Sequence, residues 1–228
     1  MKQIIAIGGG GFMSAQSSYA LERYCLNQTQ EAQPNVCFLP QASNEDRGYI
    51  AKYYECFLAL GANPTWLSLF GRVPKGWQEK IFTADLIYVG GGNTRSMLAL
   101  WREWGVDLLL KEAYERGAVL SGISAGAICW FEACVTDSVW PLGTLEGLNL
   151  LPGACCPHYD SEPERRPTFL TKVKDGSIIP GIALQDGCAA HYQDGQLHKV
   201  VSDRLNTSAF YVNAQGETPI SCQYIGER

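Results

Sequence analysis

The stretch of residues 118–128 decides the fold, and it reads AVLSGISAGAI. A short apolar run leads into Gly122-Ile-Ser124-Ala-Gly126, after which small residues begin a helix. The pattern is typical of a nucleophile elbow, a sharp strand-to-helix turn that exposes a serine hydroxyl at the carboxyl end of the strand. We therefore predict that Ser124 is a nucleophile and that the amide of Ala125 donates to an oxyanion. The alternative is an ordinary tight turn in which Ser124 only caps the helix.

Short apolar runs and longer amphipathic segments alternate along the first half of the chain. Such alternation indicates βαβ units, and hence a parallel sheet with helices on both faces. We therefore predict a doubly wound α/β fold. The expected strands are residues 4–7, 36–39, 66–69, 86–89 and 118–120, and the expected helices are residues 14–28, 44–60, 75–82 and 94–116, the last one broken at Gly105 with a cap from Asp107.

The second half of the chain has a different rhythm. Residues 136–166 are rich in proline, glycine and acidic residues and carry few helix signals. Residues 188–199 form a hairpin pattern around Asp194-Gly195, because a two-residue Asp-Gly turn is the strongest short hairpin signal. Since no repeat or linker interrupts the 228 residues, we predict a single domain with C-terminal β-hairpins. Two further strands are expected, at residues 209–212 and 219–224.

Composition excludes several classes of protein. Of the 228 residues, 46% are hydrophobic and 18% are charged, which is typical of a chain with a buried core and excludes disorder. The net charge is −5 and the longest basic cluster is Arg165-Arg166, which argues against a nucleic-acid partner. No apolar run approaches the roughly 20 residues of a membrane-spanning helix.

The amino-terminal residues and the cysteines bear on location. Residues 1–8 read as a first strand and not as a signal peptide, because glycines interrupt any apolar region. The nine cysteines form no C-x-x-C pair. We therefore expect reduced, mostly buried thiols in a cytoplasmic protein.

Two glycine-rich segments follow predicted strands. Three successive glycines come after residues 86–89, at the sheet edge where open parallel sheets form their sites, so Gly91 or Gly92 is expected to supply a second oxyanion donor. Phosphate binding and simple turn geometry are the alternatives, although no Walker motif follows. The segment 8–11 departs from a dinucleotide fingerprint because Met13 stands at the third glycine position. We expect no cofactor.

A serine nucleophile needs a base, and the chain has three histidines. His191 and His198 are expected to lie opposite each other across the hairpin, which is usually a structural pairing. As a metal pair they would lack an obvious third ligand, so no metal site is expected. His158 lies in a stretch without helix or strand periodicity, where functional residues concentrate. By elimination, His158 is the predicted base.

Several carboxylates compete for the role of the acid that orients the base. We favour Asp137, because it lies between Ser124 and His158 in a loop-like stretch. The alternatives are Glu132, Glu146, Asp160 and Asp186.

Several features occur in one order along the chain, namely VGGGNT at residues 89–94, GISAGA at residues 122–127, Asp137, LLP at residues 150–152 and PHY at residues 157–159. In these features the chain resembles the peptidase E family, serine peptidases on a fold similar to class I glutamine amidotransferases. The resemblance implies a triad of Ser124, His158 and Asp137, whereas a cysteine at the nucleophile position would have indicated amidotransfer. It also implies an exopeptidase that hydrolyses small peptides, including dipeptides with an N-terminal Asp, and a homodimer.

The resemblance also bears on substrate binding. An acidic first residue needs a cationic partner, and Arg165 and Arg166 are candidates for a bidentate contact with its carboxylate. The alternative is a solvated basic pair that balances Glu162 and Glu164. Asn93 is a third expected substrate contact. Two other functions stay open: a non-peptidase serine hydrolase acting on esters or amides, and a protein that binds a small anion without catalysis.

Overall fold

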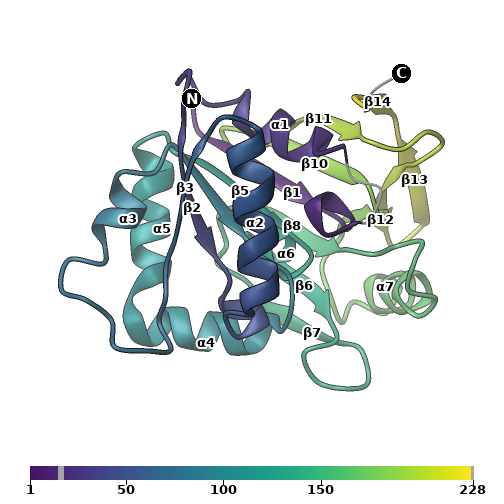
Figure 1. Cartoon of the computed structure of the whole chain (residues 1–228). Coiled ribbons are helices and arrows are strands. Elements are labelled where there is room, and N and C mark those ends of the chain that lie inside the picture. Colours follow the sequence, from purple (N-terminus) through teal and green to yellow (C-terminus); the bar gives the residue numbers. More distant parts are fainter. Residues whose placement is uncertain (15–17, 227–228) are drawn as a thin grey trace.

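The computed structural model describes residues 1–14 and 18–226, and an eight-stranded sheet forms its centre (Figure 1). Its parallel strands, in spatial order, are β1 (Gln3–Ile7), β5 (Val119–Ile123), β4 (Leu86–Val89), β2 (Asn35–Leu39) and β3 (Asn63–Trp66). Every residue of β1, β4 and β5 is buried. Burial on both faces explains why β4, and β1 after Gln3, read as unbroken apolar runs.

Helices cover both faces of this sheet (Figure 1). One face carries α1 (Ala20–Leu26) and α2 (Arg47–Ala59). The opposite face packs against α3 (Glu79–Phe82), α4 (Thr94–Trp104) and α5 (Val106–Glu115). The doubly wound α/β prediction is therefore confirmed, and its parallel strands end at a common edge.

Element boundaries differ from the predictions at a few places. The third strand covers Asn63–Trp66 and not residues 66–69, because Pro64 and Thr65 pair with β2 at the sheet edge, where proline is tolerated. The helix expected at residues 14–28 begins at Ala20, after a short 3₁₀ turn (Gly11–Met13), and residues 15–17 lie outside the described part.

The long helix expected at residues 94–116 breaks at Gly105, as predicted. Gly105 has a φ of 69°, ends α4 and begins α5. Asp107 lies in the first turn of α5 but makes no capping hydrogen bond, because Gly105 itself occupies the N-cap. The cap assigned to Asp107 is therefore wrong.

Late segments of the chain extend the same sheet beyond β1. Strand β10 (Cys188–Gln193) pairs antiparallel with β1, β11 (Gln196–Ser202) pairs with β10, and β14 (Cys222–Tyr224) forms the edge. The predicted turn joins β10 to β11, with Asp194 and Gly195 at φ values of 48° and 80°, as an Asp-Gly hairpin requires.

A second, six-stranded sheet was not predicted. Its strand order is β13 (Gly216–Ile220), β12 (Ala209–Asn213), β9 (Gly181–Leu184), β8 (Leu151–Cys156), β6 (Phe131–Thr136) and β7 (Gly143–Glu146). Helix α7 (Arg165–Lys174) packs on it through Phe169 and Val173. Strands β7 and β8 lie within residues 136–166, where Pro152 and Gly153 hide the strand signal. The strand expected at 219–224 is divided between β13 in this sheet and β14 in the other.

The two sheets share one hydrophobic core. Ile4 and Leu120 of the first sheet belong to the same buried cluster as Leu151 and Ile182 of the second. Because the sheets are joined in this way, loops from both can meet at the edge where the parallel strands end. All nine cysteines are free thiols, and eight of them are buried. Across residues 1–14 and 18–226, no helix has the length and apolar character to cross a bilayer.

Candidate active site

Ser124 lies on the sharp turn between β5 and the short helix α6 (Ala125–Ile128). Its φ of 56° and ψ of −112° are rare for a residue other than glycine. The Ser124 amide donates to the carbonyl of Ile7 on the neighbouring strand at 3.0 Å, which helps to hold the turn in place. A strained serine held by surrounding structure is the geometry of a nucleophile elbow.

The glycines on either side of Ser124 are required by close packing. A Cβ at Gly122 would lie 2.5 Å from the carbonyl oxygen of Gly126, and a Cβ at Gly126 would overlap the carbonyl oxygen of Val89. The first turn of α6 therefore passes against β4 and β5 with no room for a side chain. This is the physical reason for the Gly-x-Ser-x-Gly pattern.

His158 bridges Ser124 to a carboxylate. Its Nε2 lies 2.9 Å from Ser124 Oγ, and its Nδ1 lies 2.8 Å from Asp186 Oδ1. His158 lies two residues after the end of β8, and its amide donates to the Gly8 carbonyl beyond β1. The predicted pairing of Ser124 with His158 is therefore present in the structure.

The carboxylate beside His158 is Asp186, one of the alternatives, and the choice of Asp137 is wrong. Asp186 lies in the turn that links β9 to β10. Asp137 follows β6, on the opposite side of β8, and its carboxylate lies 3.4 Å from Arg165 instead. His158 lies on the β9 side, since the amide of the next residue, Tyr159, donates to the carbonyl of Leu184.

The surroundings of Asp186 keep its carboxylate ionised. Partial burial would raise the pKa of Asp186, but hydrogen bonds from His158 and Ser161, and the nearby charge of Arg204, outweigh burial and lower it. Asp160, which was another candidate for the orienting acid, accepts a 2.9 Å hydrogen bond from the Asp186 amide and so fixes the backbone of Asp186. An ionised acid at Nδ1 fixes the tautomer in which Nε2 can accept a proton.

Gly9 packs so closely against His158 and Asp186 that no residue with a side chain would fit at this position. A Cβ at Gly9 would overlap Asp186 Oδ1 and lie 2.6 Å from His158 Nδ1. The Gly9 carbonyl also accepts a 2.9 Å hydrogen bond from the Gly187 amide, next to the acid. The glycines of residues 8–11, which do not fit a dinucleotide site, therefore allow the first loop to lie against the histidine and its acid.

The expected oxyanion donors differ in their availability. A Cβ at Gly91 would lie 3.2 Å from Ser124 Cβ, so this glycine is adjacent to the nucleophile, but its amide donates to the Tyr49 hydroxyl at 3.1 Å. The amides of Gly92 and Ala125 donate to no other residue in the described part of the chain. These two amides are thus available to a ligand, whereas the Gly91 amide is occupied.

The three expected substrate contacts have structural partners. Asn93 caps α4 by accepting from the Ser96 amide, and its side-chain amide donates to the Ser138 carbonyl. Arg165 is buried, with only 2% of its side chain exposed, and is held by Glu162, Asp137 and the Val135 carbonyl.

Arg166 pairs with Glu217 and lies over the rings of Tyr159 and Phe210. Arg165 is therefore fully engaged within the protein, and the Nε and Nη2 groups of Arg166 are occupied by Glu217.

The remaining histidines lie away from this site. A bulge after His191 shifts the register of the hairpin, so His191 pairs with Lys199 and not with His198. His191 is fully buried between Tyr24 and Gln3, and burial lowers its pKa to about 4. It is a neutral core residue. In residues 1–14 and 18–226, no three His, Cys, Asp or Glu side chains converge as metal ligands would.

Comparison with known proteins identifies the family. A model of peptidase family S51 matches residues 4–200. The chain belongs to peptidase family S51. Across 99% of its length and 100% of the relative's, it is 45% identical to the uncharacterized peptidase YgaJ of Bacillus subtilis (strain 168). It is 28% identical to peptidase E of Haemophilus influenzae over 61% of this chain and 67% of the relative.

A solved structure shares the S51 fold of this chain. The crystal structure of a peptidase from an acI-B1 Actinobacterium superposes with a TM-score of 0.71 at 17% identity, covering 97% of this chain and 95% of the other. The similarity at this identity concerns the fold, which agrees with the predicted resemblance to the peptidase E family.

A buried carboxyl group that the sequence analysis missed lies beneath the first glycine loop of this S51 chain. Glu22 accepts from the Phe12 amide at 2.9 Å and from the Tyr88 hydroxyl at 3.4 Å, and its second oxygen is buried without a partner in the described structure. Burial raises the pKa of Glu22 to about 7. Its position inside an otherwise apolar helix face gave no sequence signal.

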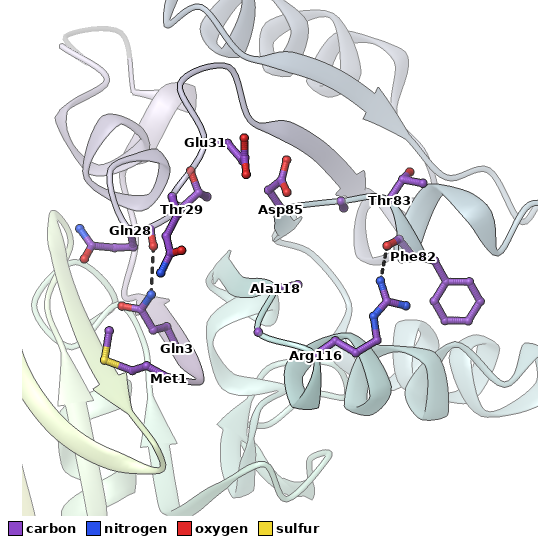
Figure 2. Close-up of a pocket in the computed structure, with 13 residues that line it drawn as sticks. Met1, Gln3, Gln28, Thr29, Glu31, Phe82, Thr83, Asp85, Arg116 and Ala118 are labelled. Carbon is purple, nitrogen blue, oxygen red and sulfur yellow. Dashed lines mark hydrogen bonds between the residues drawn. The ribbon is translucent and has the colours of Figure 1, made fainter.

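A separate hollow of about 400 Å³ lies at the opposite edge of the main sheet (Figure 2). It is lined by residues where the strands begin, such as Gln3 and Ala118, together with Asp85 and Arg116. Figure 2 shows the Arg116 guanidinium bonded to the Phe82 carbonyl. This hollow is separated from Ser124 by the length of the parallel strands, so it takes no part in the candidate active site.

Proposed function

We propose that this S51 chain is a serine peptidase that hydrolyses short peptides through Ser124, His158 and Asp186. The observation that carries the proposal is the continuous chain of contacts from Ser124 Oγ through the imidazole to Asp186 Oδ1, at 2.9 and 2.8 Å. Both distances are within hydrogen-bonding range, and the serine lies on a strained elbow, as a nucleophile does.

The reaction proceeds in two halves. His158 Nε2 removes the proton from Ser124 Oγ while the oxygen attacks the peptide carbonyl, and Asp186 stabilises the resulting imidazolium. The imidazolium then gives that proton to the leaving amine, which leaves an acyl group on Ser124. In the second half, His158 activates a water molecule that attacks this ester, and the acid product is released with the serine restored.

The developing oxyanion needs donors that are not already in use. The free amides of Gly92 and Ala125 meet that need, and Ala125 stands at the start of α6. We propose these two amides as the oxyanion hole. The Gly91 amide is not included, because it donates to the Tyr49 hydroxyl. Short peptides and exopeptidase action are proposed from the resemblance to peptidase E. An Asp preference is left out, because carboxylates already hold both Arg165 and Arg166.

A fluorophosphonate probe tests the nucleophile directly. Labelling of the purified protein, followed by mapping of the modified peptide, is expected to place the probe on Ser124, and Ser124→Ala is expected to abolish labelling. Removal of a triad nucleophile lowers kcat by about 10⁶-fold in a well-studied serine peptidase, and a similar loss is expected here. A labelled residue other than Ser124 would overturn the proposal.

Substrate class and cleavage mode need a second assay. Hydrolysis of dipeptides, tripeptides and hexapeptides, each with a free or acetylated amino terminus, is expected to favour the short, free peptides. Matched esters serve as the comparison. Turnover of esters with no turnover of any peptide would assign the site to a different class of hydrolase.

A further inference from the structure

A hollow of about 410 Å³ lies between the loops that follow β6 and β8. Its walls come from two short segments of the chain, before and after the predicted base. The lining residues are Asp137, Trp140, Leu142, Glu162, Pro163 and Glu164. Pockets of a few hundred cubic ångströms accommodate small ligands or single side chains.

Both walls of the hollow are tied to the triad. Strands β6 and β8 are parallel neighbours, so their carboxyl ends lie side by side. On one wall, the Glu162 amide donates to the His158 carbonyl at 3.1 Å.

On the other wall, the Ser138 carbonyl accepts from the Asn93 side chain at 3.1 Å. Asn93 continues the glycine segment whose Gly91 abuts Ser124. The walls of the hollow are therefore linked by hydrogen bonds to His158 and to the segment that contacts Ser124.

The hollow carries negative charge. Asp137, Glu162 and Glu164 contribute three carboxylates, and the buried guanidinium of Arg165 neutralises one of those charges. The carboxylates keep contact with solvent, since 56% of the Asp137 side chain and 44% of the Glu162 side chain are exposed. Arg165 directs its nitrogens to these two groups and to a backbone carbonyl, so it presents no cation to a ligand.

The rest of the wall is apolar and aromatic. Trp140 is 71% exposed, which is unusual for a large indole ring, and Leu142 and Pro163 adjoin it. An aliphatic stem packs on such a surface while a cationic head is attracted both by carboxylates and by the face of an indole. Lysine and arginine are the side chains that combine these two parts. An aspartate side chain would instead be repelled.

We propose that this hollow is a specificity pocket that takes the lysine or arginine side chain of a peptide residue adjacent to the scissile bond. This inference rests on the proposed peptidase function for its role in turnover, but not for binding. It reverses the acidic preference that the resemblance implies, because the charge beside the triad has the opposite sign.

The kinetic test compares peptides that differ only in the cation. Lysine is compared with norleucine, which has the same stem without the ammonium group, at either position of a dipeptide. The unmodified enzyme is expected to have a kcat/KM about tenfold higher for the lysine peptides, and Glu164→Gln is expected to reduce that ratio by about three- to tenfold. Glu164 makes no capping bond to α7, so this change preserves the helix start.

Two further variants test the aromatic wall and provide a control. Trp140→Ala is expected to lower kcat/KM for lysine peptides by about tenfold, through loss of the aromatic face. Glu103→Gln removes an exposed carboxylate on α4, away from the hollow, and is expected to leave the ratio unchanged. Peptides acetylated only on the lysine ε-amine identify the cation, because a preference that persists without the ε-ammonium charge would overturn the proposal.

A binding measurement separates this pocket from the reaction. Titration calorimetry with the Ser124→Ala protein is expected to give tighter binding of lysine than of norleucine peptides, with the difference lost when Glu164→Gln is added. Selective binding without turnover by the unmodified enzyme would refute the peptidase and leave the pocket standing. Equal binding of both peptides, or a ratio that Glu164→Gln does not change, would refute the pocket.

Discussion

The eight-stranded and six-stranded sheets contribute to the site in different ways. The first sheet carries Ser124, the proposed nucleophile, on a turn whose geometry is set by its immediate neighbours, because Ser124 is held by Ile7 and flanked by glycines that pack on Val89. The second sheet carries His158 and Asp186, the proposed base and acid, on loops after β8 and β9, which are brought together by strand pairing. The position of Ser124 is therefore a local feature, and the His158–Asp186 pair is a product of long-range topology.

The largest expected effect that tests this comparison comes from the acid. Asp186→Asn is expected to lower kcat by about 10⁴-fold, because an amide holds the imidazole in the wrong tautomer, whereas Asp137→Asn is expected to lower it by less than about tenfold. Steady-state kinetics with a norleucine dipeptide measures both. A larger loss in Asp137→Asn than in Asp186→Asn would assign the role of the orienting acid to Asp137, and the loop after β9 would then take no part in catalysis.

A smaller loss is expected where the two sheets meet. Gly9→Ala places a methyl group against Asp186 and His158, and a displacement of about 1 Å in such a pair reduces kcat by about 10²-fold. Gly71→Ala is the control, since a Cβ there meets nothing within 4 Å. Full activity in Gly9→Ala, at equal thermal stability, would show that the first loop does not constrain the pair.

The buried carboxyl group of Glu22, beneath the glycine loop that follows β1, makes the stability of the first sheet depend on pH. Because the pKa of Glu22 is raised from 4.5 to about 7, its stabilising contribution is complete below about pH 4.5 and is lost as the pH rises through 7. Glu22→Gln is therefore expected to gain stability relative to the parent protein by up to about 3 kcal/mol between pH 5 and pH 8.

Urea unfolding at several pH values measures this difference. The exposed Glu31→Gln variant provides the control, because its carboxylate faces solvent. A pH-independent difference between the parent and Glu22→Gln would mean that Glu22 is ionised throughout.

The smallest effect concerns the occupied amide. Tyr49→Phe removes the acceptor of the Gly91 amide and frees a third donor beside Ser124, in addition to Gly92 and Ala125. Loss of one neutral hydrogen bond corresponds to about 1 kcal/mol, so kcat is expected to change by less than about fivefold. A loss beyond about 100-fold would show that Tyr49 positions the glycine segment for catalysis. The kcat values of the parent protein and Tyr49→Phe, measured with the same peptides, distinguish these outcomes.

Sequence reasoning located those parts of the molecule that local patterns specify. Ser124 and its glycines could be read from the eleven residues 118–128, and the parallel strands could be read from apolar runs. His158 was found because only three histidines exist. Asp186 could not be distinguished from Asp137 by spacing, because the choice depends on which neighbour of β8 its loop follows.

The second sheet escaped prediction for a related reason. Its strands β7 and β9 have four residues each, and β8 contains both a proline and a glycine, so no periodicity marks them. The pairing of Arg165 with Glu162 was one of the alternatives read from the sequence, but its burial against Asp137 and the pairing of Arg166 with Glu217 were hidden, since Asp137 and Glu217 are distant in the chain. Charge pairing between distant segments leaves no trace in local sequence.

The antiparallel pairing of β1 with β10 has a consequence for the timing of activity. The first strand is flanked by a segment from the far end of the chain, and Lys2 bonds to Asp194 across a separation of 192 positions. The ribosome extends the chain from its amino terminus at roughly 5–20 residues per second, and a domain folds as a unit. A nascent chain whose synthesis has not yet passed Asp186 carries Ser124 without the proposed acid, so the proposed triad can form only when synthesis is nearly complete.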